Sequence, residues 1–344
     1  MGREPESPGP EAYRVAGVDL AAGAQAVELI RDVARGAARP GAVGEIGGFS
    51  GLFDLGDGRY LSAATDGVGT KLEVARRAGR YDTVGIDLVG MSANDVVCTG
   101  AEPLFFLDYL AVERVVPEQV AAIVEGVAEG CRRAGCALLG GETAEHPGTM
   151  PEGSFDLAGF CVGIVERGQL LAADRVEAGD ALIGFRSSGL HANGYSLVRR
   201  VLPTDDRDLA AVVPQLGRPL VDELLEPTAL YVRPLLSLRD AGLAKSAAHI
   251  TGGGLHENVP RALPAGLGAE IDRAAWTPPP IFGMVAEAAG TTTEELFGVL
   301  NMGIGMIVAV APGDAPRAVR IAGEGGVEAV EIGAVVGEPG VRLR

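Results

Sequence analysis

The stretch "LSAATDGVGTKLEVARRAG", residues 61–79, begins with the alternation of a β-strand and ends with the spacing of an amphipathic helix. The connection between them holds Asp66, two glycines and Lys71. The chain has 27 arginines and only two lysines, of which the other is Lys245. The stretch therefore predicts a strand, a glycine turn and a helix in succession, with an unusual cation at the turn.

Helix-like and strand-like segments alternate along the first half of the chain. Residues 24–35 have helical spacing, which is typical of a covering helix, whereas residues 102–112, "EPLFFLDYLAV", form an apolar run that predicts a strand buried on both faces. Residues 117–135 begin with proline and end with glycine, which predicts a complete helix. Residues 136–142 and 155–166 read as strands that follow it.

The chain of 344 residues is about twice the usual domain length, which predicts two domains. The periodicity breaks near residue 170, so we expect a disordered tail over 1–14, a first domain over 15–170 and a second over 171–344. A new strand begins within residues 181–189, and the second half again mixes strands with helices. The whole chain is predicted to be α/β or α+β with mixed sheets.

Composition narrows the classes of partner. The net charge of -17 and the lack of a basic run argue against nucleic acid, and no apolar run reaches the roughly 18 residues of a membrane span. The first residues lack the features of a secretory signal. Cysteine spacing matches neither a zinc ribbon nor a disulfide scaffold, which predicts reduced thiols and a cytoplasmic protein. The cysteines are Cys98, Cys131, Cys136 and Cys161.

Four glycine-rich turns could hold an anion, because glycine allows backbone N–H groups to converge. They span residues 44–51, 65–71, 187–196 and 249–258. None has the spacing of a P-loop, since Lys71 follows a threonine instead of preceding it. If the chain binds ATP, it binds it in another manner.

Carboxylates lie beside these turns. Asp66 ends a predicted strand, Asp95 lies among small and apolar residues, and Glu142 and Glu145 follow a strand that looks buried. Such acids suit a hard divalent cation on nucleotide phosphates. Asp66 and Asp95 could instead cap a turn or a helix. For each of the four histidines, a packing or hydrogen-bonding role is the alternative to catalysis.

The turns occur in an order that resembles that of the phosphoribosylformylglycinamidine cyclo-ligases, also called aminoimidazole ribonucleotide synthetases. The resemblance runs from about Gly17 to Gly305 and is carried by "TDGVGTKL", "GIDLVGMSANDVVCTGAEPLFFLDYLA", "GGETAEHPG", "HANGYSLVR" and "HITGGGLHENVPRALP". It implies a two-domain homodimer in which N-terminal strands of both subunits form a barrel. It also implies ATP-dependent cyclisation of formylglycinamidine ribonucleotide to aminoimidazole ribonucleotide through an iminophosphate, with release of ADP and phosphate, in cytoplasmic purine synthesis.

The same resemblance implies roles for individual residues. ATP is expected at Gly47, Gly48, Asp66, Gly67, Gly69, Thr70, Lys71, Asp95, Gly141 and Glu142. The substrate is expected at Ser187, Ser188, Gly189, His191, Asn193, Gly194, Thr251, Gly252, Gly253 and Gly254. Mg²⁺ is expected on Asp66, Asp95 and Glu142. The catalytic candidates are Lys71, Asp95, His191 and Asn193.

Two other functions stay open at this point. Thiamine monophosphate kinase is a relative with the same ATP-binding architecture, and a catalytically silent nucleotide-binding subunit is a different class. Selenophosphate synthetase is disfavoured, because it would carry a reactive cysteine or selenocysteine in its first glycine loop, whereas the first cysteine here is Cys98.

The presence of a lysine at position 71 leads to a specific hypothesis about its role. In a chain that otherwise uses arginine, a lysine indicates a compact point charge among the phosphate oxygens of ATP, where a guanidinium would be too wide. Lys71→Arg is then expected to lose at least tenfold in turnover although it keeps the charge, while the same exchange at Lys245 is expected to be nearly silent. The alternative is that the position of the lysine is chance.

Overall fold

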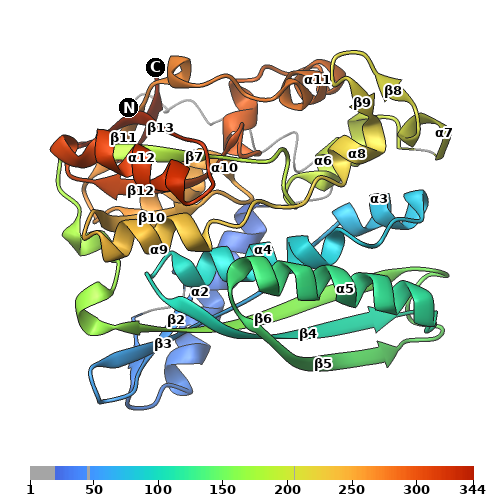
Figure 1. Cartoon of the computed structure of the whole chain (residues 1–344), viewed down its shortest axis with the longest axis horizontal. Helices are drawn as coiled ribbons and strands as arrows, with labels where there is room; N and C mark the ends of the chain where they lie inside the picture. The colour runs from blue at the N-terminus through green and yellow to red at the C-terminus, as the bar shows by residue number, and fades with distance from the viewer. Residues whose placement is uncertain (1–19, 45–46, 205) are drawn as a thin grey trace.

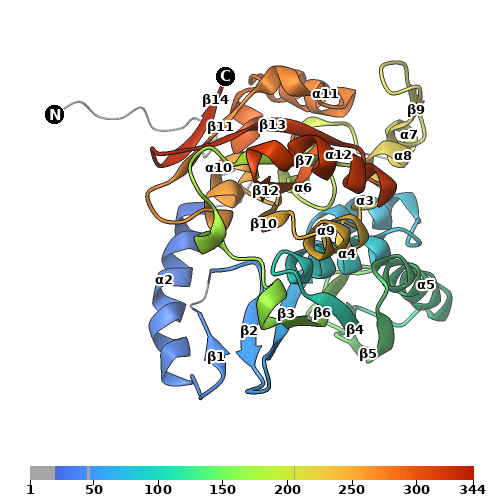
Figure 2. The ribbon, with the colours of Figure 1, turned by 60° about the vertical axis from the view of Figure 1, so that its left-hand side comes forward.

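The computed structural model describes residues 20–44, 47–204 and 206–344. The predicted tail over residues 1–14 lies outside this part of the chain. The described residues form two mixed six-stranded sheets with helices, which confirms the predicted α/β class. Figures 1 and 2 show helices α4 (Val84–Val97) and α5 (Pro117–Ala134) lying between the first sheet and the second half of the chain.

The first sheet has the order β1-β2-β3-β6-β4-β5 and is antiparallel except for its last pair, β4 and β5. Its strands are β1 (Ala42–Val43), β2 (Gly51–Asp54), β3 (Arg59–Gly67), β4 (Glu102–Val112), β5 (Ala137–Glu145) and β6 (Phe155–Glu166). The helices of this half, besides α4 and α5, are α2 (Leu20–Gly36) and α3 (Lys71–Ala78). The predicted helix after residue 117 is confirmed, and it ends at Gly135 in a left-handed cap with φ of 75°.

The second sheet has the order β10-β12-β7-β13-β11-β14, and again only the last pair, β11 and β14, is parallel. Its strands are β7 (Ala181–Arg186), β10 (Ala244–His249), β11 (Gly268–Ile271), β12 (Ile304–Val310), β13 (Ala329–Val336) and β14 (Gly340–Leu343). Its helices include α6 (Tyr195–Val201), α8 (Leu220–Leu224), α9 (Val232–Asp240), α10 (Gly254–Asn258), α11 (Pro280–Ala289) and α12 (Ala315–Glu324). A small excursion carries α7 (Asp206–Leu209), β8 (Val212–Val213) and β9 (Arg218–Pro219). The domain boundary near residue 170 stays a prediction and falls between the two sheets.

The expectation that residues 102–112 are buried on both faces is wrong for a single chain. Strand β4 alternates between buried and exposed positions, and Leu104, Leu107 and Tyr109 keep exposed fractions of 41%, 36% and 40%. The reason is that α4 and α5 cover one face of the sheet and leave the other open (Figure 1). Phe160 of β6 and Leu139 of β5 add to this open apolar face.

Two further expectations about burial are also wrong. Strand β5, which looked buried in the sequence, is the edge of its sheet, and Gly141, Glu142 and Glu145 are exposed on it. Helix α2 stands beside β1 and β2 in Figure 2, and its Leu29 and Val33 are 69% and 76% exposed, so it does not act as a covering helix within one chain. No described helix has the length and hydropathy needed to cross a bilayer.

Helices α4 and α5 approach each other so closely that their contact requires glycine. A Cβ atom on Gly85 would lie 2.3 Å from the carbonyl oxygen of Ile123 and 2.3 Å from the backbone nitrogen of Val127. From the other side, a Cβ atom on Gly126 would lie 2.5 Å from the carbonyl oxygen of Asp82. This contact fixes α4, whose opposite face carries the polar residues of the site.

We predict that Gly85→Ala destabilises the protein by about 1 to 3 kcal/mol, because the added methyl group would overlap backbone atoms that cannot move aside. The free energy of unfolding in urea measures the effect. Gly283→Ala is the matched control, since Gly283 lies in α11 with nothing within 4 Å of its Cβ position. That exchange should stabilise by roughly 0.5 to 1 kcal/mol. Equal stability of the wild type and Gly85→Ala would contradict the close approach of the helices.

Candidate functional site

One face of α4 connects the two halves of the chain. The polar and sulfur-bearing residues of this face recur at helical spacing, so they point in one direction. They are Asp87, Met91, Asn94 and Asp95. Asn94 accepts a hydrogen bond from the Tyr231 backbone N–H at 2.8 Å and donates one to the Ala229 carbonyl at 2.9 Å. Helix α4 therefore holds the segment before α9 against the first half.

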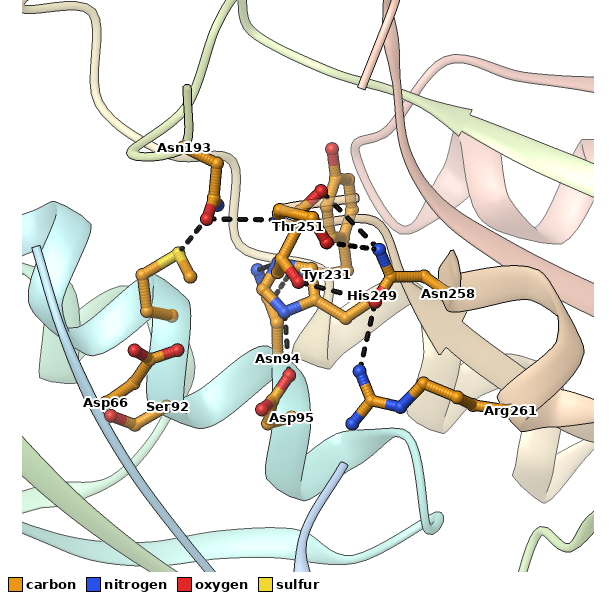
Figure 3. Close-up of polar contacts among 12 residues, drawn as sticks. Asp66, Ser92, Asn94, Asp95, Asn193, Tyr231, His249, Thr251, Asn258 and Arg261 are labelled. Carbon is orange, nitrogen blue, oxygen red and sulfur yellow. Dashed lines mark hydrogen bonds and ion pairs between the residues drawn. The ribbon is translucent and has the colours of Figure 1, made fainter. Parts of the chain in front are cut away.

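Asp95 forms an ion-pair geometry with a histidine of the other half. Its Oδ1 lies 2.8 Å from Nδ1 of His249, a contact drawn as a dashed line in Figure 3. His249 is the last residue of β10, and its side chain is fully buried. Asp95 lies inside α4 and keeps 16% of its side chain exposed, so the alternative that it caps a helix is wrong. His249 was not among the predicted site residues; its signal in the sequence was a histidine at a strand end, three positions before a run of three glycines.

Asp66 lies at the end of β3 as predicted, and its environment is electrostatically strained. Burial, together with the negative charge of Asp95, raises the pKa of Asp66 to about 6, against the lowering effect of the Gly67 N–H that donates to it at 2.7 Å. Figure 3 places both carboxylates on the same side of α4. A buried carboxylate beside a second carboxylate offers a suitable pair of oxygen ligands for a cation.

Glu142 does not join this pair within one chain. Asp66 is paired across the sheet with Gly159, Gly159 with Asp108, and Asp108 with Gly141. Three strand spacings of about 4.8 Å separate Asp66 from the Glu142 strand by about 14 Å. The predicted set of three metal ligands is therefore wrong for a single chain, and no group of three or more His, Cys, Asp or Glu able to hold a metal occurs among the described residues.

Lys71 does not lie at the surface of the turn, and the prediction that it contacts ATP phosphates is wrong for this conformation. Its side chain is fully buried, and Nζ lies 2.8 Å and 2.9 Å from the two carboxylate oxygens of Asp87. The ammonium group also donates to the carbonyl oxygens of His191 at 3.0 Å and Glu226 at 2.7 Å. These acceptors use all its protons, and two of them belong to the second half of the chain.

The burial of this ion pair acts on both partners. It lowers the pKa of Lys71 and raises the pKa of Asp87, and each charge opposes the shift of the other. Asp87 also accepts from the N–H and the hydroxyl of Thr228, at 2.8 Å and 2.7 Å. The second lysine follows the same pattern, because Lys245 lies 2.7 Å from the buried carboxylate of Asp180. The expectation that Lys245 tolerates exchange therefore lacks support.

The two predicted substrate loops do come together. Asn193, in the loop before α6, accepts a hydrogen bond from the Gly252 N–H at 3.2 Å and lies 3.6 Å from the sulfur of Met91. Thr251 and Gly252 are partly exposed beside it. The other predicted substrate-binding residues are buried or form hydrogen bonds within the protein. Buried members are Gly189, Gly194, Gly253 and Gly254.

Ser187, Ser188 and His191 bond within the protein. The Ser187 hydroxyl donates to the Asn301 side chain at 3.0 Å, and the Ser188 hydroxyl donates to a carbonyl at 2.6 Å. The ring of His191 is 1% exposed, and its Nε2 accepts the N–H groups of Ser188 and Ala229 at 3.3 Å and 3.4 Å. Burial lowers the pKa of His191 well below its usual value. A neutral, enclosed ring does not fit the predicted contact of His191 with a reacting amide.

The predicted nucleotide turns remain accessible. Gly47 and Gly48 are exposed and line a pocket of about 740 Å³ between α2 and β3. Gly69, with φ of 68°, and Thr70 are exposed in the turn before α3, next to Gly67 at the end of β3. Sequence reasoning missed a further contact to the first of these loops, which comes from Arg261.

The fold and the loops that meet at α4 match a known family in two parts. Residues 47–165 match the family described as AIR synthase related protein, N-terminal domain, and residues 177–344 match AIR synthase related protein, C-terminal domain. The phosphoribosylformylglycinamidine cyclo-ligase of Myxococcus xanthus is 51% identical over 328 residues, which cover 94% of this chain and 95% of the relative. That of Geobacillus kaustophilus is 50% identical over 336 residues, covering 96% and 97%. The chain belongs to the phosphoribosylformylglycinamidine cyclo-ligase family.

Solved structures share the fold at low sequence identity. The thiamine-monophosphate kinase from Stenotrophomonas maltophilia has a TM-score of 0.63 at 21% identity and covers 90% of this chain and 93% of its own. The structure of AaThiL complexed with AMPPCP and TMP has a TM-score of 0.63 at 17% identity, covering 92% and 91%. These similarities confirm the AIR synthase-like architecture.

We predict that Lys71→Met lowers the free energy of unfolding in urea by about 3 to 5 kcal/mol, because it leaves the buried charge of Asp87 without a partner. Lys71→Arg should also destabilise, since a guanidinium group needs more room than the ammonium group. The double variant Lys71→Met/Asp87→Asn should recover at least half of the loss, because the amide keeps an acceptor but carries no charge. An unchanged unfolding free energy together with lost activity would restore the phosphate-contact hypothesis.

The raised pKa of Asp66 predicts a pH-dependent stability. The folded protein binds this proton more strongly than the unfolded chain, so the carboxyl group costs stability as pH rises from about 4 through 6. Asp66→Asn should therefore gain on the wild type over this range, reaching roughly 2 to 3 kcal/mol at pH 7.5 without nucleotide or Mg²⁺. Urea unfolding at several pH values measures the difference. Asp57→Asn, at an exposed carboxylate, should show no such gain; a flat difference for Asp66→Asn would refute the coupling.

Proposed function

We propose that this chain catalyses the ATP-dependent cyclisation of formylglycinamidine ribonucleotide to aminoimidazole ribonucleotide, with release of ADP and phosphate, in purine synthesis. The observation that carries the proposal is the convergence at α4 of Asp95 and Asp66 from the first half with the loops around Asn193 and Gly252 from the second. A nucleotide site and a substrate site then lie next to each other, as transfer between two bound molecules requires.

The chemistry divides into two steps. The formyl amide oxygen of the substrate attacks the γ-phosphorus of ATP, the bond from that phosphorus to the bridging oxygen breaks, and ADP leaves. The amide nitrogen loses its proton, which gives the iminophosphate. The neighbouring amidine nitrogen then attacks the carbon of the iminophosphate, the carbon–oxygen bond breaks with release of phosphate, and a proton is lost as the ring forms. Positioning and charge neutralisation dominate such a reaction, because the protein forms no covalent bond.

The described residues fit a nucleotide-bound Mg²⁺. Mg²⁺ bound to phosphates needs only one or two protein carboxylates, and Asp66 and Asp95 form such a pair. When bound, Mg²⁺ supplies positive charge that neutralises the triphosphate. His249 holds the Asp95 carboxylate through its Nδ1 contact at 2.8 Å, which fixes the direction of the free oxygen.

We assign ligand-binding roles to the exposed residues of the site and positioning roles to the buried ones. Gly47 and Gly48 are proposed to cover the nucleotide, while the accessible turn before α3 offers backbone N–H groups to its phosphates. Asn193 and the 251–254 turn are proposed to hold the substrate. For Lys71 and His191 we now propose a positioning role, because both side chains are buried and hydrogen-bond to backbone groups of another segment. Lys71 donates to the carbonyl oxygen of His191, and the His191 ring accepts the N–H of Ala229.

The alternatives are less well supported. This chain is 51% identical to a cyclo-ligase but 21% identical to the thiamine-monophosphate kinase of Stenotrophomonas maltophilia. A catalytically silent subunit would need no pair of acids beside two intact loops.

The test is phosphate release from ATP. We predict slow release from ATP and Mg²⁺ alone, and stimulation of at least about tenfold by formylglycinamidine ribonucleotide, because the phosphoryl acceptor is the amide oxygen of that substrate. Asp95→Asn should abolish the stimulated release while the circular dichroism spectrum stays unchanged. Thiamine monophosphate serves as the control acceptor and should not stimulate. Equal release with and without the ribonucleotide would refute the proposed reaction.

We also propose a cytoplasmic homodimer that buries the open apolar face of the first sheet, since a patch containing Leu104, Leu107, Tyr109, Leu139 and Phe160 is unusual on a monomer.

Light scattering at micromolar concentration tests the dimer. The wild type should have twice the mass of one chain, and Leu107→Asp should be a monomer, because a charge cannot be buried in an apolar interface without large cost. Val212→Asp is the control at a 63% exposed apolar residue far from the sheet, on β8, and should leave the mass unchanged. A monomeric wild type would overturn the proposal.

A further inference from the structure

Arg261 belongs to the second half of the chain but binds the glycine loop of the first. Its Nη2 donates to the carbonyl oxygen of Gly48 at 2.9 Å, and its Nε donates to that of Gly47 at 3.3 Å. The guanidinium carbon lies 3.7 Å from the ring centroid of Phe49, which is a close cation–π contact. A single side chain thus holds three successive residues of the loop.

The third nitrogen of Arg261 reaches the other loop of the site. Nη1 donates to Oδ1 of Asn258 at 3.0 Å, and Asn258 is itself buried. The Asn258 amide donates in turn to the carbonyl oxygens of Gly254 at 2.8 Å and Gly252 at 3.1 Å. Figure 3 shows Arg261 and Asn258 beside Thr251, with His249 and Asp95 next to them. Arg261 is therefore connected through Asn258 to the turn that meets Asn193.

These contacts use the particular shape of arginine. Its planar fork points three nitrogens in fixed directions while its face stacks on an aromatic ring, and a lysine ammonium cannot do both. Asp95 attracts the Arg261 charge, so the side chain also lies within the electrostatic field of the proposed metal-binding carboxylates. Its donors nevertheless go to loop carbonyl oxygens and to an amide.

We propose that Arg261 is a positioning residue that couples the two loops, so that substrate at the 251–254 turn strengthens nucleotide binding under the loop at residues 47–49. The inference rests on the proposed function, because it assigns the nucleotide to one loop and the substrate to the other. Substrate at the 251–254 turn fixes Asn258, and nucleotide under the 47–49 loop fixes Phe49; either contact also fixes Arg261. The second ligand then binds with a smaller loss of conformational entropy. By linkage, the nucleotide strengthens substrate binding by the same factor.

Calorimetric titration tests the coupling with AMPPNP and Mg²⁺ as the nucleotide probe. The dissociation constant is measured with and without saturating formylglycinamidine ribonucleotide, and the ratio of the two values is the coupling factor. The wild type should show a factor of about five or more, within the usual range of allosteric coupling. Arg261→Ala and Arg261→Lys should both bring the factor close to one, because lysine keeps the charge but loses the fork and the stack.

A matched control separates the contact from the loss of an arginine. Arg320→Ala removes an arginine on α12 that is 62% exposed and paired with Glu324, and it should keep the wild-type factor. Phe49→Leu keeps Arg261 but removes the ring beneath it, and it should lower the factor even where Arg261→Ala fails to fold. In steady state, the KM for ATP should rise in Arg261→Lys more than kcat falls.

The outcomes distinguish this inference from the function on which it rests. A wild type that releases phosphate on addition of the ribonucleotide but shows a factor of one overturns the coupling and leaves the function standing. A wild-type factor that persists in folded Arg261→Lys and in Phe49→Leu assigns the coupling elsewhere and also overturns the proposal. A wild type that binds no AMPPNP, or releases no extra phosphate, removes the proposed function and this inference with it.

Discussion

The buried ion pair of Lys71 and Asp87 is the constraint on which the arrangement of the two halves depends. A buried charge is tolerated only where every bond it can make is satisfied, and here the acceptors come from α4 and from two segments of the second half. The Lys71 ammonium therefore has its full set of acceptors only when the halves are docked. Once docked, α4 presents Asp95 to His249, and the polar face of α4 becomes the floor of the site.

The site is divided between the halves in a regular way. The first half supplies the carboxylates and the exposed glycine turns, and the second half supplies the histidine, the asparagines and the arginine that direct them. Neither half contains a complete set. Close packing at Gly85 fixes α4 on α5 and so relative to the first sheet. Because α4 carries residues of the site, this contact helps to set the distance between the two loops although it lies far from them.

Much of the fold could be predicted from the sequence because it depends on local pattern. The helix from Pro117 to Gly135 carries its own start and stop signals, and the strand over 155–166 carries its own periodicity. The errors at the site have a common cause, which is separation along the chain. Lys71 meets two of its three acceptor residues 120 and 155 positions away, and His249 meets Asp95 across 154 residues. Glu142 was misplaced because strand order is not visible in local pattern.

The burial of both lysines has a practical consequence for chemical labelling. Amine-reactive reagents modify lysine side chains that reach solvent, yet Lys71 is fully enclosed and only 21% of the Lys245 side chain is exposed. The surface cations are arginines, which such reagents leave unmodified. Acylation of Lys71 therefore requires the two halves to move apart. The rate of acylation of this side chain then measures how often the halves separate.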